Sequence, residues 1–319
     1  MSKLQVKRNN PSSVKTPNNT LRTCKTAWKN REYYLLLIPA LVYLIIFAYA
    51  PMYGIQIAFK NYRGSLGIAG SKWVGFKHFV NFVTAFNFWT LVKNTLTLSV
   101  YSLLVTFPIP IVLALILNEL SPKFKKFSQT VLYAPHFLST VVLVGMMMVM
   151  FSKSSGVINT ILEALGLERY YFFGEPEAFR HLFVWSSVWQ NMGWNSIIYI
   201  AALSGIDSTL HEAAEIDGAN RIQRIIHINI PCILPTVIIM LIMAVGNIAS
   251  VGYEKAFLMQ NDLNISVSEI ISTYVYKRGI VYSNYSFSAA VGLFNNVINV
   301  SMIVIANAIS RKVSETSLF

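Results

Sequence analysis

The sequence predicts an all-α, polytopic membrane protein with six transmembrane helices, and three observations support this fold class. Only 13% of the 319 residues are charged, whereas soluble domains carry about 25%. Hydrophobic residues make up 54% of the chain, and they gather in runs of roughly 20, the length that a helix needs to cross a bilayer. Because unpaired backbone groups are costly in lipid, each run is expected to be helical.

The predicted spans are evenly spaced and form one membrane domain, 33–319, after a basic tail, 1–32. They cover residues 33–59, 91–117, 129–151, 181–203, 233–253 and 287–309. The tail has no apolar face, so we expect it to be disordered. The first span is too long for a signal-peptide core and lacks a small-x-small cleavage site, so we expect it to be retained. Bends are expected at the prolines of the second and third spans, Pro108, Pro110 and Pro135.

Basic residues in the connections predict the orientation of the chain. The formal net charge is +12, and its distribution is typical of a membrane protein with positive cytoplasmic segments rather than of a nucleic-acid-binding protein. The tail, the connection after the second span and the C-terminal end are basic, whereas the connection after the third span is acidic. We therefore predict that both termini are cytoplasmic. Cys24 and Cys232 then lie on the same, cytoplasmic side, where we expect neither a disulfide nor a zinc site.

The connection between the fourth and fifth spans, 204–231, differs from the others because it carries helix signals. The residues that can cap a helix at its start are Asp207, Ser208 and Thr209. Thr209 and Glu212 have the spacing of a capping box. Gly218 is expected to end this helix, and residues 221–226 are predicted to form a second short amphipathic helical turn that leads to Pro231. The sequence therefore predicts a helix–turn–helix across the cytoplasmic face of the membrane.

Residues 212–231 read Glu-Ala-Ala, three residues, Gly, nine residues, Ile, one residue and Ile-Pro. This pattern resembles the EAA loop of the permease subunits of bacterial ABC importers, whose usual form ends in Leu-Pro. The segments WVGFKHF (73–79) and YAP (133–135) resemble the carbohydrate-uptake, maltose-type branch, and MYGIQIAFK (52–60) resembles its oligosaccharide and polysaccharide-fragment members. The resemblance covers the whole chain after the basic tail.

The resemblance implies a permease of the bacterial cytoplasmic membrane that moves sugars or oligosaccharides inward by alternating access. It implies that loop 204–231 docks on an ATPase subunit. The residues expected to couple the two subunits are Glu212, Ala213, Ala214, Asp217, Gly218, Arg221 and Pro231. The expected partners are a second, usually different, permease chain, two ATP-binding subunits and an extracytoplasmic solute-binding protein. ATP and Mg²⁺ would be used by the partner ATPase subunits, and this chain would bind no cofactor.

Motifs for catalysis are incomplete in this chain. His211-Glu212 lacks the second histidine of a zinc-protease HExxH motif, and residues 67–72 lack the glycine spacing of a phosphate-binding loop. We therefore expect a transport subunit that is not an enzyme and holds no metal.

Polar residues inside two predicted spans mark a candidate substrate path, because such residues are costly in lipid. They are Gln190, Asn191 and Trp194 in the fourth span, and Asn247, Ser250 and Glu254, spaced as one helix face, in the fifth. Amides can bond sugar hydroxyls and an indole can stack on a sugar ring. Helix–helix hydrogen bonding explains Gln190, Trp194 and Asn247 equally well, and Glu254 can instead mark the membrane interface. Asn295, Asn296 and Asn299 of the sixth span are expected to pack against other spans or against the partner subunit.

Two other functions remain open from the sequence. The chain can be an importer permease for a solute other than a sugar. A stand-alone secondary transporter is the other alternative, although it would call for mid-span ionisable residues and inverted repeats, which the sequence does not show convincingly.

Overall fold

The computed structural model describes residues 30–314, in two units that comprise residues 30–55 and 56–314. Nearly all of the expected tail, 1–32, therefore lies outside the described residues, as does Cys24. Regular structure is almost entirely helical, with one two-stranded exception. β1 (Lys60–Asn61) pairs antiparallel with β2 (Lys72–Trp73), with Lys60 opposite Trp73. The all-α fold is confirmed.

The first unit is a helical segment that begins at Arg31. It consists of α2 (Arg31–Leu44), the π-helical turn η1 (Ile45–Tyr49), α3 (Ala50–Met52) and the start of η2 (Tyr53–Phe59). Residues 31–59 together are long and apolar enough to cross a membrane. None of the side chains in α2, η1 and α3 is buried.

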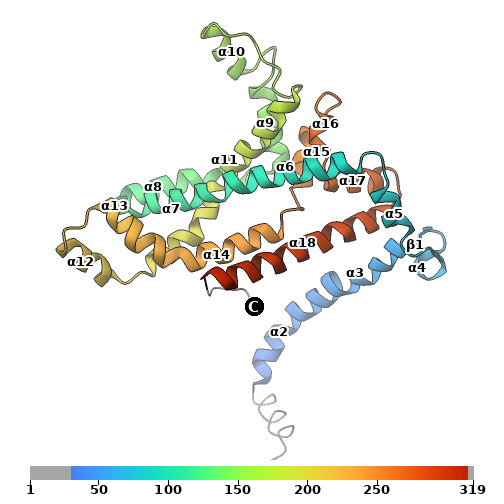
Figure 1. Cartoon of the computed structure of the whole chain (residues 1–319), viewed down its shortest axis with the longest axis horizontal. Coiled ribbons are helices and arrows are strands. Elements are labelled where there is room, and N and C mark those ends of the chain that lie inside the picture. Colours follow the sequence, from blue (N-terminus) through green and yellow to red (C-terminus); the bar gives the residue numbers. More distant parts are fainter. Residues whose placement is uncertain (1–29, 315–319) are drawn as a thin grey trace, which may run out of the picture. The chain divides into compact units, whose positions relative to one another are not determined.

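The second unit is a bundle of long helices (Figure 1). These helices are α6 (Phe88–Thr106), α7 (Pro108–Asn118), α8 (Pro122–Tyr133), α11 (Pro176–Ser204), α14 (Ile230–Gly246) and α18 (Tyr285–Ser314). α11 packs on α6, α7, α8 and α14, and α14 packs on α18. α11 is therefore the central helix of the unit.

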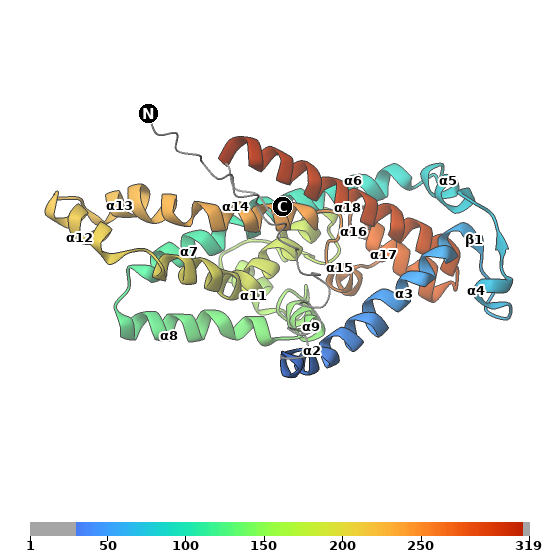
Figure 2. The same ribbon diagram turned by 90° about the horizontal axis from the view of Figure 1, so that it is seen from below.

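Shorter elements occupy the ends of this bundle (Figure 2). At one end lie α12 (Ser208–Ile216), α13 (Arg221–Arg224) and the π-helical turn η4 (Ile225–Asn229). Towards the other end lie α4 (Gly67–Gly70), α5 (Lys77–Val83), α15 (Tyr253–Met259), α16 (Ile265–Ser268), α17 (Ile271–Tyr276) and η5 (Lys277–Val281). The remaining helices are η3 (Ala134–Phe137), α9 (Thr140–Met150) and α10 (Val157–Ala164).

Two of the hydrophobic clusters in the second unit draw on the same helix. Phe179, Phe183 and Val184 of α11 belong to a cluster with residues of α6, α9 and α15. Further along, Tyr199 and Leu203 of α11 pack with residues of α7 and α14. Burial of both stretches fixes the rotation of α11 about its axis, and therefore decides which of its polar residues face a cavity.

Four of the six predicted spans are long, apolar helices: Arg31–Phe59, Phe88–Asn118, Arg221–Gly246 and Tyr285–Lys312. The fourth predicted span lies within α11, whose 29 residues are long enough, but whose polar residues exclude it from this apolar set. The polytopic fold is confirmed. The polar helix α11 is surrounded by protein on several sides, because it contacts α6, α7, α8 and α14.

The prediction of one continuous third span was wrong. The chain instead forms α8 and η3, then turns by 96° into α9. Pro135 stands in η3, and Ser139 caps α9 by accepting a hydrogen bond from the backbone N–H of Val142 at 3.3 Å. Proline and a new N-cap together end one helix and start another, which is a larger effect than the expected bend.

The predicted fifth span also has different ends. Its helix begins at Arg221 and ends at Gly246, seven residues before the expected end at Tyr253. The chain leaves the helix at Asn247, where two asparagines of α18 hold it: Asn299 Oδ1 accepts from the backbone N–H of Ala249 at 2.9 Å, and Asn295 Nδ2 donates to the Ala249 carbonyl at 3.0 Å. The expected packing role of Asn295 and Asn299 is thus confirmed.

Gly193 tests the packing of α11 on α8. An added Cβ would lie 2.6 Å from the carbonyl carbon of Leu132, and nearer still to its oxygen. Gly193→Ala should therefore push the helices apart and destabilise the protein by about 1–3 kcal/mol, seen as a lower apparent Tm in detergent. Gly145→Ala is the matched control, because its Cβ meets no atom within 4 Å. Equal Tm values for the two variants would contradict this packing.

Candidate functional site

A polar cavity of about 520 Å³ opens between α6, α11 and the C-terminal end of α14, with α15 alongside. Its hydroxyl groups come from Ser99, Ser102, Thr106, Thr140 and Ser187. Its amides come from Gln190, Asn191, Asn195 and Asn247, and its charged groups from Glu254 and Lys255. The cavity can therefore offer many hydrogen-bond donors and acceptors to a polar ligand.

The structure brings four of the six candidate path residues to this cavity. They are Gln190, Asn191, Asn247 and Glu254. Ser250 does not line it, and its hydroxyl accepts a hydrogen bond from Asn299 Nδ2 at 2.6 Å. Trp194 does not line it either, and its ring lies against His136.

The expectation that Asn247, Ser250 and Glu254 share one helix face was wrong. α14 ends at Gly246, and Glu254 belongs to the separate helix α15. A Cβ on Gly246 would lie 2.8 Å from Ile303 of α18, so the end of α14 lies close to that helix. Asn247 and Glu254 reach the same cavity because the chain turns between the two helices, a change that periodicity cannot indicate.

Three side chains of α11 contact the break between α8 and α9. Gln190 Nε2 donates to the Leu138 carbonyl at 2.8 Å, and Asn191 Oδ1 lies 2.9 Å from His136 Nδ1. The Trp194 and His136 rings are stacked, with centroids 4.4 Å apart and an interplanar angle of 7°. We call these contacts the α11 clamp. They satisfy polar groups that the broken span exposes, and they account for Trp194 without a ligand.

Lys255 is the principal residue of the cavity that the sequence analysis missed. It is 7% exposed, and its ammonium group donates to the Phe183 carbonyl at 3.0 Å and to Ser187 Oγ at 2.8 Å. The same nitrogen lies 5.0 Å from the centroid of the Phe183 ring. Lys255 follows the predicted fifth span directly, so its burial depends on α15 folding back onto α11.

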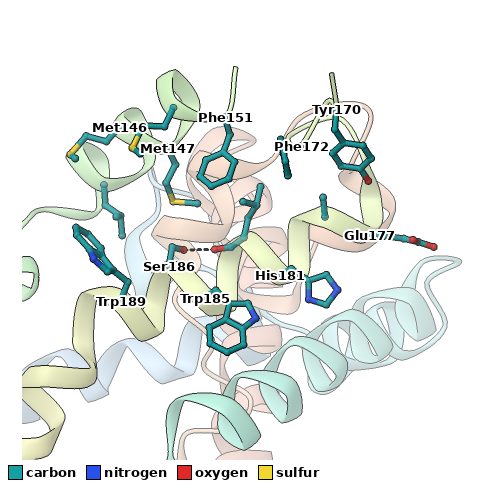
Figure 3. Close-up of a pocket in the computed structure, with 14 residues that line it drawn as sticks. Met146, Met147, Phe151, Tyr170, Phe172, Glu177, His181, Trp185, Ser186 and Trp189 are labelled. Atoms are coloured by element: carbon teal, nitrogen blue, oxygen red, sulfur yellow. Dashed lines mark hydrogen bonds between the residues drawn. The ribbon is translucent and has the colours of Figure 1, made fainter. Parts of the chain in front are cut away.

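A larger cavity of about 720 Å³ lies between α9 and α11 and is apolar (Figure 3). The labelled side chains of its walls include Met146, Met147, Phe151, Trp185 and Trp189. Its few polar groups are already engaged in part, because the Ser186 hydroxyl donates to the Leu182 carbonyl and His181 Nδ1 lies 2.8 Å from the Tyr101 hydroxyl. None of the candidate path residues lines it, and its walls offer little to a polar ligand.

The loop 204–231 contains a well-defined helix at one end of the bundle. Asp207 caps α12 by accepting from the backbone N–H of Thr209 at 3.0 Å, and this bond holds the pKa of Asp207 below its usual range. Gly218, at φ +79°, ends it as predicted. The Ala219 N–H donates to the Ala214 carbonyl at 2.8 Å, which closes the C-terminal turn.

Two details of this loop differ from the prediction. The capping box is formed by Asn220 and Gln223 (2.8 and 2.9 Å) rather than by Thr209 and Glu212, because Thr209 already lies inside α12. The second helix is also not separate: α13, η4 and α14 form one 26-residue helix. The π-helical turn η4 immediately precedes Ile230-Pro231, where it accommodates the missing proline N–H.

The candidate coupling residues present a mostly exposed surface. Six of these residues are exposed: Glu212, Ala213, Asp217, Gly218, Arg221 and Pro231. Ala214 is half-buried. Arg224 bridges to Glu215 at 3.4 Å and so ties α13 to α12. Ile216, at 87% exposure, projects from the end of α12, so the loop is a rigid and partly apolar surface with no covering element in the described chain.

A membrane-spanning bundle with a polar cavity between its helices and a rigid exposed loop at one end is the architecture of a membrane transport subunit. Residues 106–315 match the family of binding-protein-dependent transport system inner membrane components. The chain belongs to this family, and is therefore a transport subunit rather than an enzyme.

Individual relatives agree over nearly the whole chain. The chain is 40% identical over 287 residues to the polygalacturonan/rhamnogalacturonan transport system permease protein YteP of Bacillus subtilis (strain 168), covering 90% of this chain and 89% of YteP. It is 42% identical over 292 residues to Protein LplB of the same organism, covering 91% and 92%. A chain from the crystal structure of a bacterial ABC transporter for import of the acidic polysaccharide alginate matches with a TM-score of 0.84 at 39% identity, covering 92% of this chain and 99% of that chain.

Proposed function

We propose that this chain is the permease subunit of an ATP-driven importer that moves oligosaccharides into the cytoplasm. The observation that carries the proposal is the convergence of Gln190, Asn191, Asn247 and Glu254 on one polar cavity. Its volume of about 520 Å³ is within the range of small-molecule sites. Hydroxyl and amide groups both donate and accept, as sugar hydroxyls do. The names of YteP and of the alginate importer support the substrate class.

The proposed energy source lies in separate subunits. Two ATP-binding subunits would dock on loop 204–231 through the exposed face of α12 and would use the ATP and Mg²⁺. A second homologous permease chain would complete the path. A related alginate importer has been solved with a pentasaccharide-bound periplasmic protein, which supports a solute-binding protein as a further partner. In this arrangement, both termini and the loop lie on the cytoplasmic side of a bacterial inner membrane.

Two helices connect the proposed docking loop to the cavity. α11 carries Gln190 and Asn191 into the cavity and ends at Ser204, where the loop begins. On the other side, the helix from Arg221 to Gly246 is about 39 Å long and delivers Asn247 to the cavity. A rotation of α12 would thus move two walls of the cavity together, which is the mechanical requirement for alternating access.

Asn247 and Trp194 should separate a transport role from a packing role. Asn247 Nδ2 bonds only the Met243 carbonyl of its own helix, at 3.1 Å, and the residue lines the cavity. Asn247→Ala should therefore reduce uptake by reconstituted importer severalfold at unchanged Tm. Trp194→Ala removes the stack on His136 and should lower the free energy of unfolding by about 1 kcal/mol or more. This loss should be seen as a lower Tm. Normal uptake by Asn247→Ala at saturating and limiting substrate would contradict its place in the path.

Coupling should fail when the α12 turn or its first exposed carboxylate is changed. Gly218 has positive φ, where a β-branched side chain costs about 1–2 kcal/mol, so Gly218→Val should distort the turn. Glu212→Lys reverses an exposed charge on the proposed docking face. Both variants should insert normally but lose most of the ATPase stimulation by loaded binding protein, measured on the reconstituted complex.

The matched controls are Gly218→Asn and Glu168→Lys. Asparagine tolerates positive φ, and no atom lies within 4 Å of a Cβ at Gly218, so Gly218→Asn should stay coupled. Glu168 is exposed and lies outside the loop. Full stimulation and uptake by Gly218→Val and Glu212→Lys would show that this loop is not the coupling element.

A further inference from the structure

Lys255 places a buried amino group at the wall of the polar cavity, and burial lowers the pKa of this group to about 7. Its two hydrogen-bond acceptors, the Phe183 carbonyl and Ser187 Oγ, are uncharged. The ion pairs within residues 30–314 join other residues: Arg169 with Glu163, Arg224 with Glu215 and Lys277 with Glu269. A buried ammonium group without an anion is costly, and two neutral acceptors leave one of its three N–H donors for another group.

Packing alone accounts poorly for a lysine at this position. The two hydrogen bonds and the contact with the Phe183 ring do attach α15 to α11. An uncharged donor could make the same attachment without the cost of burying a charge. An ionisable group at the wall of a cavity in a membrane protein is the usual mark of a functional site, with an opposite charge as its partner.

Glu254 shares the cavity with Lys255 but forms no ion pair with it within residues 30–314. The two residues are adjacent in α15, but Glu254 is exposed at the cavity while Lys255 is buried. Glu254 also lies in the first turn of α15, where a carboxylate is stabilised by the helix N-terminus.

Two further cations lie along the same pair of helices. A smaller cavity of about 300 Å³ is lined by Lys93 of α6 and Arg180 of α11, with Trp89 beside them. Its lining residues from α6 and α11 lie in the first two turns of each helix, whereas α11 reaches loop 204–231 at its other end. Arg180 Nε is buried and has no hydrogen-bond partner. Neither residue takes part in the ion pairs within residues 30–314.

We propose that the path along α6 and α11 selects oligosaccharides that carry carboxylate groups, and that Lys255 binds one carboxylate in the polar cavity. Lys93 and Arg180 would receive a carboxylate earlier, where the cargo enters. The hydroxyl and amide groups around Lys255 would bind the sugar hydroxyls. This inference rests on the oligosaccharide import proposed above and narrows its substrate class. Uronate sugars have the required carboxylates, and the alginate importer's cargo is named as an acidic polysaccharide.

Direct binding to the assembled importer tests the proposal. The complex of both permeases and both ATPase subunits is placed in nanodiscs without the solute-binding protein, so that only the permease path discriminates. The probes are a galacturonic acid trimer and its fully methyl-esterified, uncharged counterpart, titrated by calorimetry. Wild type should bind the acidic trimer at least tenfold more tightly than the ester. Lys255→Met should lose this preference, and Lys255→Arg should keep most of it.

Lys153→Met is the matched control, because Lys153 is an exposed lysine outside both cavities. It should bind both probes as wild type does. A parallel assay measures uptake of the acidic trimer into proteoliposomes with the solute-binding protein, where Lys255→Met should be at least tenfold slower than Lys153→Met.

Several outcomes would overturn the proposal. One such outcome is that Lys255→Met still prefers the acidic trimer over the ester. Another is that wild type binds the two probes equally. Either result would refute selection by charge at Lys255 without contradicting oligosaccharide import. If Lys255→Met fails to assemble, Lys255→Arg decides: an assembled variant that binds both probes with equal affinity would overturn the carboxylate site at position 255. Wild type that neither binds nor imports either probe would overturn the uronate substrate class, and import of an uncharged oligosaccharide by the same complex would show that the proposed function still holds.

Discussion

The close approach of α11 to α8 at Gly193 is the contact on which the rest of the bundle depends. There is no room for a Cβ between this glycine and the Leu132 backbone, so the helices meet with their main chains nearly in contact. At that distance Gln190, Asn191 and Trp194 reach the break after α8. A span broken by 96° exposes carbonyl and amide groups that lipid cannot satisfy. The α11 clamp satisfies part of this requirement.

The same helix, α11, connects the polar cavity to the exposed loop. α11 forms the wall of the polar cavity in its middle and leads into the exposed loop at its end, while the helix from Arg221 to Gly246 returns from the loop to the cavity. In the proposed function, the cargo site and the ATPase docking site are thus about a helix length apart and are joined by these two helices. The carboxylate site proposed at Lys255 would add selectivity, because a buried ionisable group discriminates strongly between charged and neutral ligands.

Much of this could be predicted from the sequence, since the apolar runs and the Gly218 turn are local signals. The fold class and the end of α12 required no tertiary information beyond these patterns. The broken third span, the early end of α14 and the burial of Lys255 depend on contacts between distant segments. Periodicity therefore placed Asn247 and Glu254 on one face of a single helix. In the structure they lie on either side of a turn between α14 and α15, and this turn brings both to the polar cavity.

The central claim is that ATPase subunits act on the end of the bundle that carries α12. A photo-cross-linking amino acid at Ile216, which is 87% exposed, tests it most directly in the assembled importer. The matched position is Trp73 of β2, 59% exposed at the opposite end (Figure 1). We expect a cross-link from position 216 to the ATPase subunit and none from position 73. A cross-link to the ATPase from position 73, with none from position 216, would contradict it.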